Sequence, residues 1–410
     1  MNLLTVINLI LGAIFILCYA YQIIFLAISV FTKKTVYPDA EPKRLAVLIA
    51  ARNEEGVIEG LISSLKNQNY PKDMYSVFVV ADNCTDETAA VARAAGAVVY
   101  ERFNTEERGK GYALDYLIKK IKEDNPDALP DGYVVFDADN IADENYLFEM
   151  NKALSAGYDV VSSYRNSKNY GANWRSAGQG MYFLRDARVL NHTRVRLGMS
   201  TFISGTGFLF SRVLEEKYGG WPFHSLTEDG EFSLENAVSG VKGAHCHDAI
   251  FYDEQPTDLK TSWNQKLRWC KGGLQIFATY FKRLVKGIFL KRSLSCFDMV
   301  MCLAPAYILS LSAVVINAVG IAIMLILGNL SPSIVYGAIF AVSVGYFSLL
   351  LFSIFVTTTE WDRIKASAPK KILYLFTFPI FIFSFIPPAA VALFKKVEWK
   401  EIKHTTSNVQ

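Results

Sequence analysis

The stretch Val134-Val-Phe-Asp137-Ala-Asp139-Asn140 decides the fold class, because a strand-length apolar run ends there in two carboxylates. In open α/β sheets, ligands bind outside the carboxyl ends of the strands. Two carboxylates at the end of a buried strand are unfavourable unless a positive group meets them. Their oxygens are hard ligands that suit Mg²⁺ or Mn²⁺. The stretch therefore predicts that Asp137 and Asp139 hold a divalent cation at the edge of an α/β sheet.

The surrounding sequence repeats the same unit. Between residues 35 and 275, Val-rich runs of strand length alternate with segments of helical spacing. Strands separated by helices predict βαβ units and a mostly parallel, Rossmann-like sheet. The chain contains no G-x-G-x-x-G, which argues against a dinucleotide fingerprint. The expected strands are Leu45–Ala50, Ser76–Ala81, Ala97–Tyr100, Tyr133–Asp137 and Asp159–Ser163, and the expected helices are Glu54–Asn67, Asp86–Ala95 and Gly111–Glu123.

Polar residues also follow the first two expected strands. Ala51, Asn53 and Glu54 come after the first one, where an amide and a carboxylate can contact a base or a sugar. Alternatively, Asn53 caps the next helix, and acidic residues occupy its first turn. Asp82 ends the second strand and has no comparable structural explanation. We therefore expect Asp82 to contact a ligand.

Two later motifs carry groups suited to acid–base and phosphate chemistry. Asp229 follows Glu228, whose charge would raise the pKa of Asp229 and let it accept a proton from a hydroxyl. Gln265, Arg268 and Trp269 fit one helical face by their spacing. There Arg268 would meet a diphosphate, and Trp269 would stack on a sugar ring. An amphipathic helix with a surface arginine explains the same spacing.

Lys110 and a histidine pair are weaker candidates. Arg108-Gly-Lys110-Gly111 is a basic turn before an expected helix, which suits a phosphate contact, although a solvated run of charge looks the same. His245 and His247 share one face of a strand, with no third ligand nearby. Packing is therefore favoured over a metal site for the two histidines.

Composition excludes several classes of protein. Of the 410 residues, 51% are hydrophobic and 20% are charged, and this balance excludes a mainly disordered chain. A net charge of +3 is too small to indicate a nucleic-acid partner. No two cysteines form a C-x-x-C pair, so a disulfide scaffold or zinc ribbon is not expected. The cysteines are Cys18, Cys84, Cys246, Cys270, Cys296 and Cys302.

Four apolar segments predict an integral membrane protein. They are Leu3–Phe31, Phe297–Leu327, Ile334–Val356 and Ile372–Phe394. The positive-inside rule places the N-terminus outside and Lys33 in the cytoplasm. Pro379, Pro387 and Pro388 predict a broken, re-entrant last segment, which keeps the basic tail inside.

These segments divide the chain into five parts. Phe277–Lys291 mixes apolar and basic residues and predicts a helix at the membrane surface; an ordinary surface helix of the soluble domain is the alternative. The parts are a transmembrane helix (1–34), a soluble catalytic domain (35–275), an interface helix (276–296), membrane segments (297–394) and a basic tail (395–410).

The ordered set of motifs resembles the membrane-bound family-2 glycosyltransferases, such as cellulose, hyaluronan and poly-N-acetylglucosamine synthases. The resemblance covers roughly residues 44–271 and implies a GT-A fold, a UDP-sugar donor, a divalent ion and inversion at the anomeric carbon. It implies donor contacts from Ala51, Asn53, Glu54, Asp82, Lys110, Asp137, Asp139 and Arg268, a catalytic Asp229 beside Glu228, and acceptor contacts from Ser204, Gly205, Gln265 and Trp269. Trp399 in the tail weakly matches a motif of hyaluronan synthases.

The resemblance favours a processive cell-membrane β-glycosyltransferase with a cytoplasmic active site. It would extend a polysaccharide from UDP-glucose or UDP-N-acetylglucosamine and export it, with the glycan and the membrane lipids as partners. One alternative is a non-processive enzyme that acts on a lipid acceptor. Another is an inactive scaffold or transport subunit, against which the complete set of acidic residues argues.

Overall fold

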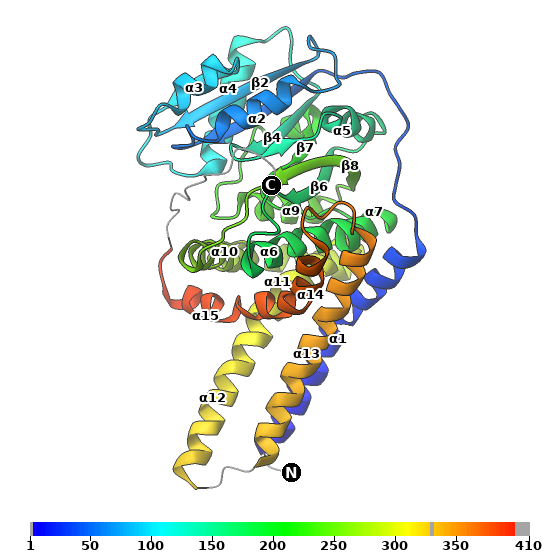
Figure 1. The fold of residues 1–410 in the computed structure, drawn as a ribbon, viewed down its shortest axis with the longest axis vertical. Coiled ribbons are helices and arrows are strands. Elements are labelled where there is room, and N and C mark those ends of the chain that lie inside the picture. The colour runs from blue at the N-terminus through cyan, green and yellow to red at the C-terminus, as the bar shows by residue number, and fades with distance from the viewer. Residues whose placement is uncertain (1–2, 329–331, 398–410) are drawn as a thin grey trace.

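The computed structural model describes residues 3–328 and 332–397 and consists of a globular part, a base layer of helices and a helical stalk (Figure 1). The globular part is built on one eight-stranded mixed sheet in the order β3-β2-β1-β4-β7-β6-β8-β5. The first four positions in this order are parallel strands, whereas β7 runs antiparallel to both of its neighbours. The strands are β1 (Leu45–Ala51), β2 (Tyr75–Asp82), β3 (Val98–Arg102), β4 (Gly132–Asp137), β5 (Ile141–Ala142), β6 (Val160–Ser167), β7 (Phe208–Ser211) and β8 (Gly243–Asp253).

Helices cover both faces of this sheet, so its central strands are buried on both sides. Val47 and Ile49 of β1 face one apolar cluster, and Ala46 and Leu48 face the other. This double burial explains why the central strands are continuous apolar runs with no polar alternation. The helices are α2 (Ile58–Lys66), α3 (Thr88–Ala94) and α5 (Tyr146–Ser155) on the first face, and α4 (Lys110–Asp124), α8 (Arg212–Tyr218) and α9 (Glu228–Ser239) on the second.

All five strands expected from the sequence are present, and the GT-A-like α/β class is confirmed. The first helix differs, because α2 begins at Ile58 and not near Glu54. Asn53 has a φ of 54°, a left-handed conformation in which it cannot serve as a helix N-cap. The alternative interpretation of Asn53 as a cap is therefore wrong.

The base layer consists of helices that lie under the sheet, across the direction of the stalk (Figure 1). Its longest member, α10 (Leu259–Lys291), is one continuous helix of 33 residues. The domain boundary expected between residues 275 and 276 thus falls inside α10. The other members are α6 (Trp174–Arg185), the π-helix η1 (Asp186–Asn191), α7 (His192–Arg196), α11 (Leu294–Ala304), α14 (Ala368–Phe383) and α15 (Ile386–Phe394).

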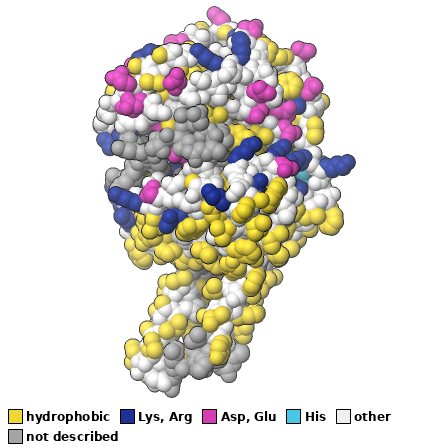
Figure 2. All heavy atoms as spheres, viewed as in Figure 1, with side chains coloured by type: hydrophobic (Ala, Val, Ile, Leu, Met, Phe, Trp, Pro, Cys, Tyr) yellow, Lys and Arg dark blue, Asp and Glu magenta, His cyan; other side chains and the backbone are white. Residues whose placement is uncertain are grey.

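The stalk contains α1 (Leu3–Phe31), α12 (Ser310–Ile326) and α13 (Pro332–Thr359) (Figure 1). By length and composition, three described helical segments could cross a membrane: Leu3–Phe31, Tyr336–Thr359 and Ala368–Phe394. Hydrophobic side chains cover the stalk and the lower rim of the globular part, whereas acidic side chains gather higher up (Figure 2). This distribution matches a protein that is anchored in a membrane by its stalk.

Two expected membrane segments differ in shape from simple crossings. The expected segment Phe297–Leu327 is divided: α11 lies in the base layer, and a π-helix, η2 (Pro305–Leu309), separates it from α12. In α11, Asp298 forms a buried ion pair with Arg194 at 2.8 Å. The last segment is broken as the prolines predict: α14 ends at Phe383, and α15 then lies across the base (Figure 1). Trp399, Lys400 and Lys403 lie outside the described residues.

Candidate active site

The loops after β1 and β2 form the first part of the candidate site. Ala51 is the last residue of β1, and the Asn53 side-chain oxygen accepts a hydrogen bond from the Thr85 backbone amide at 2.8 Å. The Glu54 amide donates to Thr88 Oγ1 at 2.8 Å. These bonds tie the two loops together, so the polar groups after neighbouring strands meet at one edge of the sheet.

Asp82 ends β2 and has a structural partner that the sequence did not reveal. Arg102 Nη1 donates to Asp82 Oδ1 at 2.7 Å, and Asn83 Nδ2 donates to the same oxygen at 3.0 Å. Arg102 is paired with Asp82 in the parallel β2–β3 register, and both side chains are buried. The expectation that Asp82 lacks a structural explanation is therefore wrong, whereas its contact with a nucleotide stays a prediction. The sequence feature that could have revealed this pair is a basic residue, Arg102, at the end of the neighbouring strand β3.

Asp137 and Asp139 lie at the end of β4, beside two lysines. The Lys110 ammonium donates to Asp137 and, at 2.7 Å, to the carbonyl of Gly205. Asp139 is buried, and its Oδ1 accepts a hydrogen bond from Asn140 Nδ2 at 3.3 Å. Burial lowers the pKa of the Lys168 ammonium, although the charge of Asp139 opposes this. The structure thus brings two carboxylates and two cations together at one strand end.

Lys110 connects this strand end to the acidic pair Glu228 and Asp229. Burial lowers the pKa of Lys110, but the charges of Asp137 and Glu228 outweigh burial and raise it above its usual value. The backbone around Lys110 is tightly placed: Gly109 has a φ of 126°, and a side chain on Gly111 would collide with the Phe223 carbonyl. Lys110 therefore stays protonated and can face a phosphate.

Glu228 and Asp229 form an acidic pair in the first turn of α9. Burial raises the pKa of Glu228 to about 7, and the charge of Asp229 adds to this, while Lys110 and Arg268 oppose it. Burial also raises the pKa of the half-buried Asp229, against the effect of Arg268 and Lys110. A carboxylate with a raised pKa is a better proton acceptor, which is the chemistry that a general base requires.

α10 holds this acidic pair in place. Arg268 Nη1 donates to the carbonyl of Leu226 at 3.0 Å, just before the acidic pair. Gly272 allows α10 to approach closely, because a Cβ there would lie 2.5 Å from a methyl group of Thr227. Gln265 accepts a hydrogen bond from Gln179 of α6 at 2.9 Å. Arg268 of the Gln-x-x-Arg-Trp motif therefore adjoins the loop before the acidic pair, whereas Gln265 contacts α6.

Trp269 lies where α6, α10 and the α14–α15 turn meet. Its ring is parallel to that of Phe385, with the centroids 6.2 Å apart, and meets Phe183 edge-on at 6.2 Å. The side chain is only partly buried. Its role as a platform for a sugar stays a prediction.

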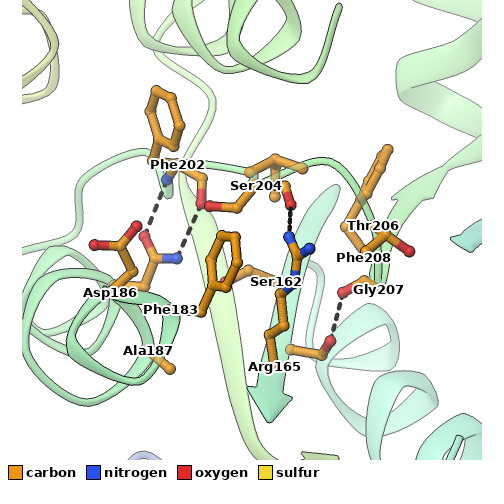
Figure 3. Close-up of a pocket in the computed structure, with 13 residues that line it drawn as sticks. Ser162, Arg165, Phe183, Asp186, Ala187, Phe202, Ser204, Thr206, Gly207 and Phe208 are labelled. Atoms are coloured by element: carbon orange, nitrogen blue, oxygen red, sulfur yellow. Dashed lines mark hydrogen bonds between the residues drawn. The ribbon is translucent and has the colours of Figure 1, made fainter. Parts of the chain in front are cut away.

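The loop Ser204–Gly207 lies between these groups and a pocket on its other side (Figure 3). Gly205 has a φ of 86°, and a Cβ on it would lie 3.7 Å from Asp229 Oδ2, so the loop faces the candidate base. Arg165 lies in the pocket and donates to the Ser204 carbonyl at 2.5 Å (Figure 3). The pocket volume of about 30 Å³ suits a water molecule or two and not a sugar.

Sequence reasoning missed Arg165 and its partner Asp253. Arg165 Nε donates to the buried Asp253 at 2.8 Å. Burial would raise the pKa of Asp253, but the charge and hydrogen bonds of Arg165 lower it. Arg165 was missed because the fifth expected strand stopped at Ser163, and Asp253 was missed because β8 was not expected as a whole strand.

The two strand histidines pack in the interior. His245 Nδ1 lies 2.9 Å from Ser162 Oγ, and His247 Nε2 lies 3.3 Å from His192 Nδ1. Burial lowers the pKa of His245 to about 3 and that of His192 to about 4. These histidines are therefore neutral at pH 7.

The model of the glycosyltransferase-like family 2 matches residues 42–272, more than half of the chain. The chain belongs to this glycosyltransferase family. A probable glycosyltransferase of Bacillus subtilis, YdaM, is 24% identical over 301 residues, which cover 68% of this chain and 66% of YdaM. The β-monoglucosyldiacylglycerol synthase of a Nostoc species is 26% identical over 281 residues, which cover 66% of this chain and 57% of that enzyme.

One solved structure matches nearly the whole chain in its fold. The mannosyltransferase PcManGT of Pyrobaculum calidifontis, in complex with GDP-Man and Mn²⁺, superimposes with a TM-score of 0.64 at 18% identity. The match covers 96% of this chain and 99% of that one, and it shows that the fold is shared. The chain spans between half and two thirds of the length of the curated relatives that it matches.

Proposed function

We propose that this family member transfers one sugar from a nucleoside diphosphate donor to a hydroxyl of a membrane lipid, with inversion at the anomeric carbon. The observation that carries the proposal is the attachment of the acidic pair to α10. Arg268 holds the loop before Asp229, and Trp269, one residue on, packs against Phe385 between α14 and α15. Asp229 therefore lies near the base layer, where a lipid headgroup can reach it.

Each of these residues has a separate role in the proposed transfer. Asp229 takes the proton from the acceptor hydroxyl, and the acceptor oxygen then forms a bond to the anomeric carbon. The bond from that carbon to the diphosphate breaks, and the diphosphate leaves with the electron pair. Arg268 and Lys110 stabilise the negative charge that develops on the leaving group. Burial keeps the pKa of Asp229 raised, against the effect of Arg268 and Lys110.

The carboxylates of β4 fit a divalent cation. Asp137 and Asp139 offer hard oxygen ligands at the strand end, and the side chain of Asp137 is 38% exposed, so it is accessible from the site. A bound Mg²⁺ or Mn²⁺ would supply Lewis-acid stabilisation of the diphosphate. Asp137 and Asp139 would hold that ion, and Asp137 accepts a hydrogen bond from Lys110 in the structure. Asn53, Glu54 and Asp82 would contact the nucleoside.

The acceptor distinguishes two candidate functions. The name of the Nostoc relative supports a diacylglycerol acceptor. A processive synthase of a polysaccharide is the second candidate, and the partly exposed Trp269 on the acceptor side supports it. A polymer synthase must hold a growing chain, whereas a lipid glycosyltransferase releases its product after one addition.

A product analysis tests both functions. The full chain in nanodiscs that contain diacylglycerol is incubated with radiolabelled UDP-glucose, UDP-N-acetylglucosamine or GDP-mannose and a divalent cation. We expect label from one donor in the organic phase, on a lipid that carries one sugar, and none with Asp229→Asn. Label confined to long, water-soluble or insoluble chains would overturn the lipid acceptor and favour the polymer. No transfer from any donor would favour an inactive scaffold.

We also propose that the catalytic domain faces the cytoplasm. Lys33 and Lys34 follow α1 on the side of the globular part, which agrees with the positive-inside rule. An impermeant maleimide should label Leu3→Cys in intact cells, whereas Lys33→Cys should react only after lysis. The unmodified chain with its six native cysteines serves as the control. The reverse pattern would overturn this orientation.

A further inference from the structure

The loop Ser204–Thr206 is attached to the donor side of the site at three consecutive residues. The Ser204 carbonyl accepts from Arg165, and the Gly205 carbonyl accepts from Lys110. Thr206 Oγ1 accepts from the Asp137 amide at 2.8 Å and lies 2.5 Å from an oxygen of Asn140, to which it donates. A short loop held at every residue takes its conformation from the groups that hold it.

Of these connections, the one through Arg165 involves the most residues. Its Nε and Nη2 both donate to Asp253, and Asp253 Oδ1 accepts from Asn140 Nδ2 at 3.1 Å. Asn140 Nδ2 also lies 3.3 Å from Asp139 Oδ1. A continuous chain of hydrogen bonds therefore leads from the carboxylate expected to hold the cation to the carbonyl of Ser204.

The surroundings of Arg165 fix its orientation. The guanidinium lies over the ring of Phe183, 3.6 Å from its centre, and its side chain is 13% exposed. The pocket beside it is small, so the guanidinium has one bound arrangement and little free space (Figure 3). A planar fork that meets a carboxylate with two donors keeps a defined geometry, which a lysine cannot reproduce.

We propose that Arg165 is a positioning residue that couples occupation of the donor site to the conformation of the acceptor loop. This inference rests on the proposed function. A diphosphate and its cation at Asp139 would restrain Asn140 and Asp253 further, and Arg165 would pass this restraint on to the Ser204 carbonyl. Gly205 then stays against Asp229, where the acceptor hydroxyl must lie. Donor binding thus prepares the acceptor side, and the coupling is reciprocal by thermodynamic necessity.

Arg165→Lys tests the coupling, because it keeps the positive charge and removes the fork. Arg363→Lys is a matched control outside the site. Arg363 donates to the His247 carbonyl at 2.7 Å and to Asp248 at 2.8 Å, and it lies over the ring of Tyr164. Both variants thus lose an arginine that contacts a carbonyl, a carboxylate and an aromatic ring. Only Arg165, however, connects the donor side of the site to the loop.

The readout is hydrogen exchange at the amides of residues 202–208, measured on the full chain in nanodiscs with and without UDP-glucose or UDP-N-acetylglucosamine and Mn²⁺. In the unmodified chain and in Arg363→Lys, we expect the nucleotide sugar to slow exchange in this loop. In Arg165→Lys, the protection should fall roughly tenfold, in the usual range for coupling between two sites, while nucleotide binding remains.

The outcomes separate the coupling from the proposed function. Nucleotide-induced protection that is equal in Arg165→Lys and the unmodified chain would overturn the coupling alone. Nucleotide binding without any protection of the loop in the unmodified chain would overturn it as well. If no nucleoside diphosphate sugar binds to the unmodified chain, both the proposed function and the coupling fail. An equal loss of protection in Arg363→Lys would reduce Arg165 to a general structural role.

Discussion

Replacing Glu228 with glutamine should stabilise the protein at pH 8, and the gain should vanish in acid. Glu228 is 8% exposed, and its pKa rises from 4.5 to about 7, chiefly because it is buried and also because Asp229 is charged. One pKa unit corresponds to about 1.36 kcal/mol. The difference of 2.5 (7 − 4.5) therefore opposes the charged form in the folded protein by roughly 3 kcal/mol.

The sign of the pH dependence follows from proton binding. Between pH 4.5 and 7 the folded chain keeps a proton on Glu228 that the unfolded chain has lost, so stability decreases as the pH rises through this window. Below it, the carboxyl is neutral in both states and resembles glutamine. Glutamine cannot ionise, so the gain at pH 8 approaches about 3 kcal/mol as an upper limit. The attraction of Lys110 and Arg268 for the charged form is already contained in the pKa of about 7.

Thermal unfolding of the purified protein at pH 5, 6.5 and 8 measures this effect. Roughly 2–4 °C per kcal/mol is expected for a domain of this size, so the apparent Tm should rise by several degrees at pH 8. Glu235→Gln in the same helix is the control with the opposite sign. Burial would raise the pKa of Glu235, but the ion pair with Arg283 at 2.6 Å lowers it, so this variant should lose stability at pH 8 and lose less in acid.

Two results would refute this reasoning. A lower Tm of Glu228→Gln at pH 8 would mean that the charged carboxylate is stabilised by Lys110 and Arg268 more than burial opposes it. A gain of equal size at all three pH values would mean that the titration of Glu228 does not contribute. The sugar-transfer activity of Glu228→Gln, measured in parallel, shows whether this destabilising carboxyl group is needed for catalysis.

Three further predictions concern the site itself. Asp229→Asn should lower transfer by about 10²–10⁴ while nucleotide binding survives, as followed by UDP release and by calorimetry; a loss of only a few-fold would remove Asp229 as the base. EDTA should abolish transfer and Mn²⁺ or Mg²⁺ should restore it in the unmodified chain but not in Asp139→Asn; full activity in chelator would contradict the metal site. Gly272→Val should push α10 away from Thr227, which lies 2.5 Å from the site of the new Cβ, and should lower the Tm as overpacking by about 1–3 kcal/mol predicts; an unchanged Tm and activity would show that the two elements can separate freely.

Most of the sheet could be predicted from the sequence because its central strands are buried on both faces. Such strands appear as unbroken apolar runs, and Leu45–Ala51 and Gly132–Asp137 are of this kind. The strands at the far side were less visible. β7 has four residues and β5 has two, which are too few to show an alternation of apolar and polar residues. β8 carries His245, His247 and Asp248 among its apolar residues, so it is not an unbroken apolar run.

The membrane segments were visible for the same reason, but their shapes were not. Apolar composition marks a segment and says little about whether it crosses a bilayer or lies along it. Asp298 belongs to the base because Arg194 of α7 neutralises it there. α10 continues past residue 275 because its first half packs against α15 and its second half packs against α9 and α11. These partners come from distant parts of the chain.

The sequence by itself determined the α/β class, the three strand ends that carry polar groups, the acidic pair and the apolar anchors. Each of these depends on local order: a run, a spacing or an adjacent pair. Only the tertiary structure decided that Asp82 is matched by Arg102, that Lys110 meets Asp137 and Gly205, and that Arg165 links Asp253 to Ser204. These contacts join residues 20 to 95 positions apart, and a charged side chain in a buried site takes the partner that the fold places beside it, because leaving its charge unpaired there is unfavourable.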